Sequence, residues 1–229
     1  MQYASKQFEH NLVKIGTISC WGVFLLGIMY IITTALGFLS LKTPHDQIDD
    51  PFFTIMELLI LFIAPLMAVS VVTAHFYNSP ENRIFSMIAV LFIFIAMGIT
   101  SCVHFVIIIL GRYVEFTNPE TFTLYFSFTW PSLVYVLDIL AWDWFFAISL
   151  FFITPVFNGN RLERVVRILL IVSGILSLGG LVGIPLENML IRNIGIIGYA
   201  VVAPFAFLLM GIVFRKKLLT ADLHKHRNR

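Results

Sequence analysis

Charged residues are scarce in this chain. Asp, Glu, Lys and Arg make up only 12% of its 229 residues, whereas about a quarter of a soluble domain is charged. Hydrophobic residues make up 59%, and 23 of them are Phe. The chain therefore has too little polar surface for a globule in water. Its apolar residues occur in runs long enough to cross a bilayer, which takes roughly 20 residues per helix. These features predict an all-α, polytopic membrane protein.

Cysteine is nearly absent, which gives no basis for a fold held together by disulfides. The two cysteines, Cys20 and Cys102, form no CxxC motif and fall at different predicted depths in the membrane, so we expect free packing thiols. The formal net charge is only +2, which gives no reason to expect a nucleic-acid partner.

Sequence signatures of several enzyme classes are missing too. The chain has no GxSxG, no glycine-rich phosphate loop, no histidine box and no DDxxD diphosphate motif. The last apolar segment contains no Lys that could carry a retinal Schiff base. HxxxH and HExxH are also absent, so we predict no metal centre, and the sequence specifies no cofactor.

Long apolar segments are abundant and predict a bundle of six transmembrane helices within one domain, 1–229. The predicted spans are 14–41, 52–77, 84–111, 131–157, 165–186 and 193–214. The first span follows a short polar segment without a convincing cleavage site, so we expect it to remain as a helix.

The distribution of Lys and Arg predicts the orientation of these spans. With the N-terminus inside, only Lys42, Arg112 and Arg192 of the 15 basic residues fall outside, and the tail 215–229 is a basic cytoplasmic anchor. The outer loops are acidic instead, as in 45-HDQIDD-50. The positive-inside rule then gives an N-in, C-in topology. We predict a multi-pass protein of a cell inner or plasma membrane.

The connection 112–130 between spans three and four is long and rich in aromatic residues. Asn118-Pro119-Glu120 is typical of a helix start, because Asn can cap, Pro suits the first turn and Glu favours the positive end of the helix dipole. We consider two interpretations. The segment is either an aromatic belt or interfacial helix in the headgroup layer, or a lid over an outward-facing cavity.

Small residues line one face of span five. They are Ser173, Ser177, Gly180 and Gly183. Small side chains let helix backbones approach closely in lipid, where burial of apolar surface does not drive helices together. We predict a packing seam here rather than a ligand site.

Four polar residues on four spans share one predicted layer. At 1.5 Å per helical residue, Glu57, His104, Asp138 and Tyr199 lie roughly 8–10 Å below the outer ends of their spans. Ionisable groups in the hydrocarbon cost several kcal/mol unless they are paired or hydrated, so each of them needs a physical reason.

Helical geometry predicts which neighbours these residues have. Asp138 shares its side of the helix with Tyr135, Trp142 and Phe145. At 100° per residue, Asp143 lies about 140° around the helix from Asp138. We therefore expect Asp143 to have a separate role, either bonding a neighbouring helix or staying protonated.

The other spans contribute similar polar stripes. Ser101 lies one turn deeper than His104 on its side of span three, and Arg192 and Tyr199 line one stripe of span six.

The Glu57, His104 and Asp138 cluster has three interpretations. It can be an interhelical hydrogen-bond network that fixes the bundle. It can be an acid/base or ligand-orienting cluster, because a low dielectric favours neutral carboxylic acids that can donate a proton. A metal site is the third, and the missing ligand spacing disfavours it.

We favour an outer-leaflet pocket for a small lipophilic ligand, with membrane lipids as partners. Asp138, His104 and Glu57 are the candidate catalytic residues, and any chemistry would be proton transfer on a lipid or isoprenoid-like substrate. The candidate ligand-binding residues are Trp130, Tyr135, Trp142, Phe145, Tyr199, Arg192 and Ser101. The sequence leaves open whether any reaction is catalysed and whether the protein forms a homo-oligomer.

The sequence is also compatible with two other function classes. The first is a proton-coupled transporter in which Asp138 and Asp143 form a proton path. The second is a non-catalytic membrane scaffold, in which a change at Asp138 would alter stability alone.

Overall fold

The protein is an all-helical bundle. The computed structural model describes residues 2–41, 48–77 and 80–227, and these residues contain helices and no β-strand. Among them, six helical stretches are long and apolar enough to cross a membrane: His10–Ser40, Phe52–Tyr77, Pro80–Thr117, Leu133–Val156, Arg161–Gly183 and Met189–Leu219. This confirms the all-α fold with six apolar helices and is compatible with a multi-pass membrane protein.

The first half of the bundle consists of three long helical stretches. They are formed by α1 (Gln2–Ser40), by α2 (Phe52–Tyr77), and by η1 (Pro80–Asn82), α3 (Arg83–Val106), η2 (Ile107–Gly111) and α4 (Arg112–Thr117) in succession. A short helical return follows, formed by α5 (Pro119–Thr121) and η3 (Phe122–Phe126).

The second half forms three further stretches. They are α6 (Leu133–Ile139), η4 (Leu140–Phe146), α7 (Ala147–Ile153) and η5 (Thr154–Val156); α8 (Arg161–Gly180) and η6 (Leu181–Gly183); and α9 (Met189–Ile196), η7 (Ile197–Val202) and α10 (Ala203–Arg227). The segments η2, η3, η4 and η7 are π-helices, which have a wider turn than an α-helix and are often found at functional sites.

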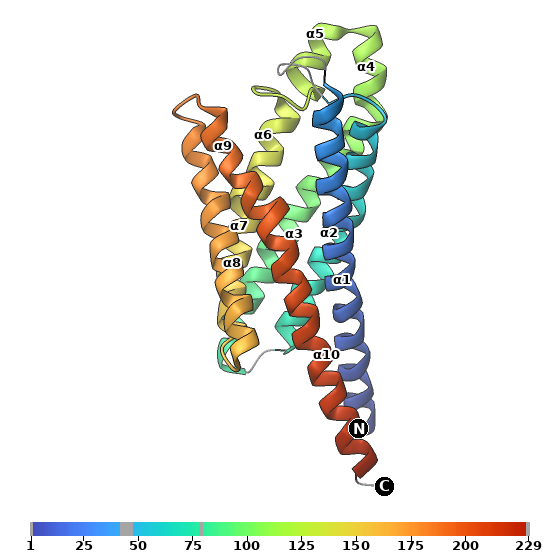
Figure 1. Cartoon of the computed structure of the whole chain (residues 1–229), viewed down its shortest axis with the longest axis vertical. Helices are drawn as coiled ribbons and strands as arrows, with labels where there is room; N and C mark the ends of the chain where they lie inside the picture. The colour runs from blue at the N-terminus through green and yellow to red at the C-terminus, as the bar shows by residue number, and fades with distance from the viewer. Residues whose placement is uncertain (1, 42–47, 78–79, 228–229) are drawn as a thin grey trace.

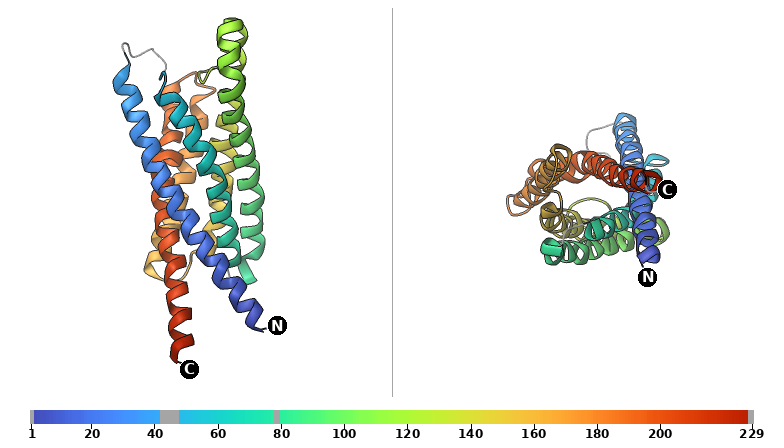
Figure 2. Two further views of the ribbon diagram at one scale, coloured as in Figure 1. Left: turned by 90° about the vertical axis from the view of Figure 1, so that its right-hand side faces the viewer. Right: turned by 90° about the horizontal axis from the view of Figure 1, so that it is seen from below.

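The six stretches form a ring in chain order. Each contacts the next, from α1 with α2 to α8 with α10, and the α1–α10 contact closes the ring. Both chain termini lie at one end, here called the terminal end, and α5 lies at the other, here called the α5 end (Figures 1 and 2). An even number of spans requires the termini to share a side. The N-in, C-in orientation itself stays a prediction.

Several helix ends differ from the predicted spans by a few residues, and two of these differences bear on the site. The third stretch continues past residue 111 to Thr117. The sixth begins at Met189 rather than at residue 193, because the Asn188 side chain accepts hydrogen bonds from the backbone N–H groups of Leu190 and Ile191, at 3.0 and 3.2 Å. Arg192, which the charge distribution assigned to the outer side, is therefore inside a helix and only 1% exposed.

The segment 112–130 folds into a helical hairpin at the α5 end (Figure 1). The Asn118 side chain accepts a hydrogen bond from the Thr121 N–H at 3.2 Å, which confirms the predicted helix start. Arg112 forms an ion pair with Asp50 and hydrogen-bonds Thr54. Residues 42–47 of the predicted acidic loop lie outside the described residues, as do the side chains of the basic tail from residue 220 onward.

The predicted small-residue seam on α8 is confirmed. The Ser173 hydroxyl donates to the Gly198 carbonyl at 2.8 Å, and a Cβ added at Gly180 would lie 2.8 Å from the Arg192 carbonyl oxygen. At Gly183 a Cβ would collide with the backbone N of Arg192. This close approach holds the α9 backbone against α8 and fixes the position of Arg192.

Candidate functional site

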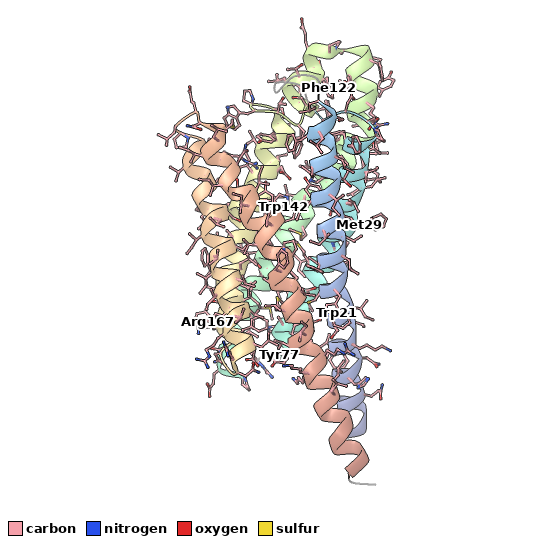
Figure 3. All side chains as sticks on the ribbon, viewed as in Figure 1. Trp21, Met29, Tyr77, Phe122, Trp142 and Arg167 are labelled. Carbon is pink, nitrogen blue, oxygen red and sulfur yellow. The ribbon has the colours of Figure 1, made fainter. Side chains whose placement is uncertain are left out.

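A cavity of about 390 Å³, here called the chamber, lies inside the ring in its α5-end half. Its charged or titratable lining consists of Glu57, His104, Asp138 and Arg192, and its main aromatic lining of Tyr30, Phe128, Tyr135, Trp142 and Tyr199. These side chains come from all stretches except α8. Trp142 lies at mid-height of the bundle, between Tyr77 near the terminal end and Phe122 near the α5 end (Figure 3).

His104 lies between two carboxyl groups on other helices. Its Nδ1 is 2.7 Å from Glu57 Oε2, which is a hydrogen bond, and its Nε2 is 3.4 Å from Asp138 Oδ1. All three side chains are at most 5% exposed. Neither Nε2 nor Oδ1 has a hydrogen-bond partner among the described residues. Glu57 therefore orients the imidazole, and the second nitrogen faces Asp138 across a distance too long for a good hydrogen bond.

Arg192 and Asp143 form a second buried ion pair beside this group. Arg192 Nε is 3.6 Å from Asp143 Oδ2, and both side chains are at most 2% exposed. The guanidinium carbon also lies 4.9 Å from the centre of the Tyr135 ring, which is a cation–π contact. Gly195 leaves room for the carboxyl group, because a Cβ there would collide with Asp143 Oδ1. Asp143 thus contacts a neighbouring helix, one of its two predicted roles, through an ion pair; neither of its oxygens has a hydrogen-bond partner among the described residues.

The predicted angle between the two acids needs correction. The value of 140° assumed α-helical geometry, but Asp143 lies in the π-helix η4. A π-helix bonds residue i to i+5, so residues five apart return closer to the same side. Asp138 and Asp143 are near enough to interact electrostatically, and Arg192 interacts with both.

Aromatic rings complete the chamber wall. Trp142 stacks on Tyr199 at 5.0 Å between ring centres. Phe128 meets Tyr135 edge to face at 5.3 Å and lies 5.8 Å from the His104 ring. Neither Phe128 nor Tyr30 was predicted from the sequence. Tyr30 lies roughly 15 Å along its span from Ser40, and this position inside a predicted span is a signal that could have pointed to it. Phe128 had only the aromatic character of its segment.

Three of the predicted ligand-binding residues do not line the chamber. Trp130 lies on a separate apolar groove with Trp144. Phe145 stacks on Phe92 at 6.0 Å, because the π-helix η4 changes the register after Asp138 and turns Phe145 away. Ser101 is a half-buried residue of α3 and is not part of the lining either. The other seven predicted site residues all line the chamber.

The chamber meets a second cavity of about 690 Å³ at the α5 end, here called the vestibule. The vestibule is lined by charged side chains, among them Asp50, Arg112 and Glu115, and by several phenylalanines. Ile48, Phe53 and Phe128 line both cavities and therefore lie between them.

The chamber also reaches the surface between α1 and α9. Phe38 of α1 and Asn193 of α9 both line it and both are exposed. The two helices diverge toward the α5 end (Figure 1). Both residues lie within stretches long and apolar enough to cross a membrane, so this opening would face lipid.

Comparison with known proteins assigns no family. No protein-family model, curated protein or solved structure matches the chain. Among the described residues, no group of three or more His, Cys, Asp or Glu side chains is placed to hold a metal ion. The chemistry that the arrangement offers is proton transfer and ion pairing inside an aromatic chamber.

Proposed function

We propose that the chamber binds one small lipophilic molecule and that Asp138 and His104 exchange a proton with it. The observation that carries this proposal is the oriented imidazole. Glu57 holds Nδ1 at 2.7 Å, while Nε2 and Asp138 Oδ1 lie 3.4 Å apart at the chamber wall without good partners. Ligand sites are typically apolar cavities of about 300–1,000 Å³ with a few convergent polar groups, and the chamber fits that description.

The route of the ligand follows from the two openings. A lipophilic molecule is concentrated in the membrane, so we infer that it enters between α1 and α9, past Phe38 and Asn193. The wall formed by Ile48, Phe53 and Phe128 separates the polar end of the chamber from the vestibule. The hairpin that carries Phe128 would then act as the predicted lid.

The reaction that suits these groups is an allylic shift of a double bond. Protonated Asp138 donates its proton to one alkene carbon, and a new C–H bond forms. His104 Nε2 removes a proton from the neighbouring allylic carbon, and that electron pair becomes the new double bond. Transfer of the proton from Nε2 back to Asp138 across their 3.4 Å gap restores the site, so no other reactant is consumed. An isoprenoid-like chain has the required alkenes.

Lipid analysis of the purified protein tests the binding. We expect mass spectrometry to find one class of lipophilic molecule co-purifying with the wild type and with Glu120→Gln, an exposed acid outside the chamber. Asp138→Asn should retain less. Incubation in D₂O should introduce deuterium at allylic positions with the wild type but not with Asp138→Asn. Retention of no molecule above empty-micelle levels would refute the proposal.

A second candidate function is proton-coupled transport. The specific observation in its favour is that the Glu57–His104–Asp138 and Arg192–Asp143 groups lie together where the chamber approaches both the vestibule and the lipid-facing opening. In liposomes with a pH gradient, flux that vanishes in both Asp138→Asn and Asp143→Asn would favour transport over chemistry.

A further inference from the structure

The buried charges of the chamber do not balance. The acids that line it are Glu57 and Asp138, its bases are Arg192 and His104, and Asp143 lies directly behind Arg192; each is at most 4% exposed. The remaining titratable side chains that face them are the phenols of Tyr30, Tyr135 and Tyr199, which carry no charge in their ordinary state. Even with His104 protonated, the acids exceed the bases by one. An uncompensated charge in a low-dielectric interior costs several kcal/mol, so the site must hold one more positive charge.

Asp138 is the acid without a counter-charge of its own. Glu57 accepts a hydrogen bond from His104 Nδ1, and Asp143 faces Arg192. Neither Asp138 Oδ1 nor the two oxygens of Asp143 have a hydrogen-bond partner among the described residues. Asp143 faces the guanidinium of Arg192, whereas Asp138 Oδ1 lies 3.4 Å from Nε2 of the imidazole that Glu57 already holds. The extra positive charge therefore belongs at Asp138, and the simplest form of it is a proton.

The wall around Asp138 suits a larger cation as well. The rings of Phe128, Tyr135 and Trp142 line the same chamber, and ring faces attract ammonium groups most strongly where water is excluded. Among the described lining residues, Arg192 is the only one with a permanent positive charge. Asp143 opposes that charge at 3.6 Å. An organic cation at Asp138 would thus complete a balance of three acids and three positive charges.

We propose that the ligand of the chamber is a lipophilic molecule with one positive charge, such as a protonated or quaternary amine, and that it replaces one proton at Asp138. This inference rests on the proposed ligand chamber and is an alternative to the double-bond chemistry, which needs the proton of Asp138 that the cation would replace. Because the cation takes the place of that proton, binding should release one proton.

Three probes with the same tail test the charge. We would titrate the full-length protein, in an uncharged maltoside detergent, with decyltrimethylammonium, decanol and decanoate below their micellar concentrations. Calorimetry in two buffers with different ionisation enthalpies gives the number of protons released. We expect decyltrimethylammonium to bind at least tenfold more tightly than the other two probes, with release of about one proton.

Variants assign the effect to Asp138. Asp138→Asn should lose the proton release and weaken decyltrimethylammonium at least tenfold relative to decanol. The decanol signal shows that this variant is folded. Asp138→Glu, which keeps the acid, should retain the proton release, and Glu120→Gln should behave as the wild type.

Each contrary outcome has a distinct meaning. Equal binding of decanol and decyltrimethylammonium without proton release would overturn the cation proposal and leave the lipophilic chamber intact. Tighter binding of decanoate would also overturn it and would identify Arg192 as an anion site. Failure of all three probes to bind would overturn the proposed function itself.

Discussion

His104 is the side chain around which the polar groups of the chamber are arranged. Its two ring nitrogens face carboxyl groups on two different helices, but only the Glu57 contact has hydrogen-bond length. A purely structural network would be expected to close both contacts, because a buried unsatisfied group costs about 1–3 kcal/mol. The open side of His104, toward Asp138 and the chamber, is therefore the part of the cluster that favours function over packing.

The Arg192–Asp143 pair gives a prediction at the residue scale. Arg192→Leu leaves Asp143 buried without its cation and should lower the free energy of unfolding by about 3–5 kcal/mol. In Arg192→Leu/Asp143→Leu both charges are absent, and most of that loss should be recovered. Denaturant unfolding in detergent measures both variants. If the double variant lost as much unfolding free energy as Arg192→Leu and Asp143→Leu lose together, the result would contradict the assignment of a coupled pair.

Phe128 gives a second residue-scale prediction. Its ring lies between the chamber and the vestibule and contacts Tyr135 at 5.3 Å. Phe128→Ala should open the wall and speed dissociation of a bound lipophilic probe by roughly tenfold or more, since most effects of this kind are in the off-rate. Stopped-flow displacement measures the rate. Phe116→Ala, which removes an 87% exposed ring of the vestibule, is the control and should leave the rate unchanged.

At the scale of elements, α8, α9 and η4 together place Asp143 beside Arg192. Glycines on α8 let the α9 backbone come close, and Gly195 of α9 leaves space for Asp143 of η4. The wide turn of η4 brings Asp143 round toward Arg192 while Trp142 still lines the chamber. The site thus depends on backbone geometry as much as on the side chains that form it.

Two matched glycine substitutions test this arrangement. Gly195→Ala should displace the Asp143 carboxyl from Arg192 and destabilise the protein by about 1–3 kcal/mol, the usual cost of overpacking. Gly98→Ala in α3 meets nothing within 4 Å and should be neutral or slightly stabilising, because alanine favours helix. Thermal unfolding in detergent compares the two. Equal effects would show that the close approach at Gly195 is unimportant.

The π-helix η4 gives its own prediction. Deletion of Leu140, which is partly exposed, should convert the wide turn to α-helical geometry and rotate Asp143 away from Arg192. We expect ligand retention to fall at least tenfold while six spans still insert, because the apolar length hardly changes. Mass spectrometry of bound lipids and a protease-protection assay measure the two effects. Undiminished ligand retention would argue against a role for the wide turn.

At the scale of the whole molecule, the ring of helices has one end with both termini and one end with the hairpin (Figures 1 and 2). The ring places the chamber in its α5-end half, next to the vestibule. If the predicted orientation holds, the vestibule opens to the outside and the basic tail lies in the cytoplasm.

Cysteine labelling tests that orientation. In a background without Cys20 and Cys102, Glu120→Cys on the α5 end should react with a membrane-impermeant maleimide added to intact cells. Glu81→Cys at the terminal end should react only after the membrane is opened. Both residues are exposed, so accessibility reports the side of the membrane. The reverse labelling pattern would invert the topology and would place the chamber in the inner leaflet.

Much of the architecture could be predicted from composition and periodicity. The scarcity of charge and the length of the apolar runs predicted six helices, and polar residues at matching depths predicted that Glu57, His104 and Asp138 would share a layer. Where backbone geometry departs from the α-helix, prediction was poorer. Phe145 was assigned to the chamber, because a regular 100° step cannot anticipate a π-turn.

The sequence alone determined that this chain has six membrane-length helices, because hydrophobic length is a local property that a single chain carries in its order of residues. Only the tertiary structure decided which polar groups meet. The 2.7 Å contact of His104 with Glu57, the burial of Arg192 beside Asp143 and the position of Phe128 at the chamber wall join helices that are distant in sequence. Their meeting depends on helix rotation and close backbone packing, which arise from the whole ring.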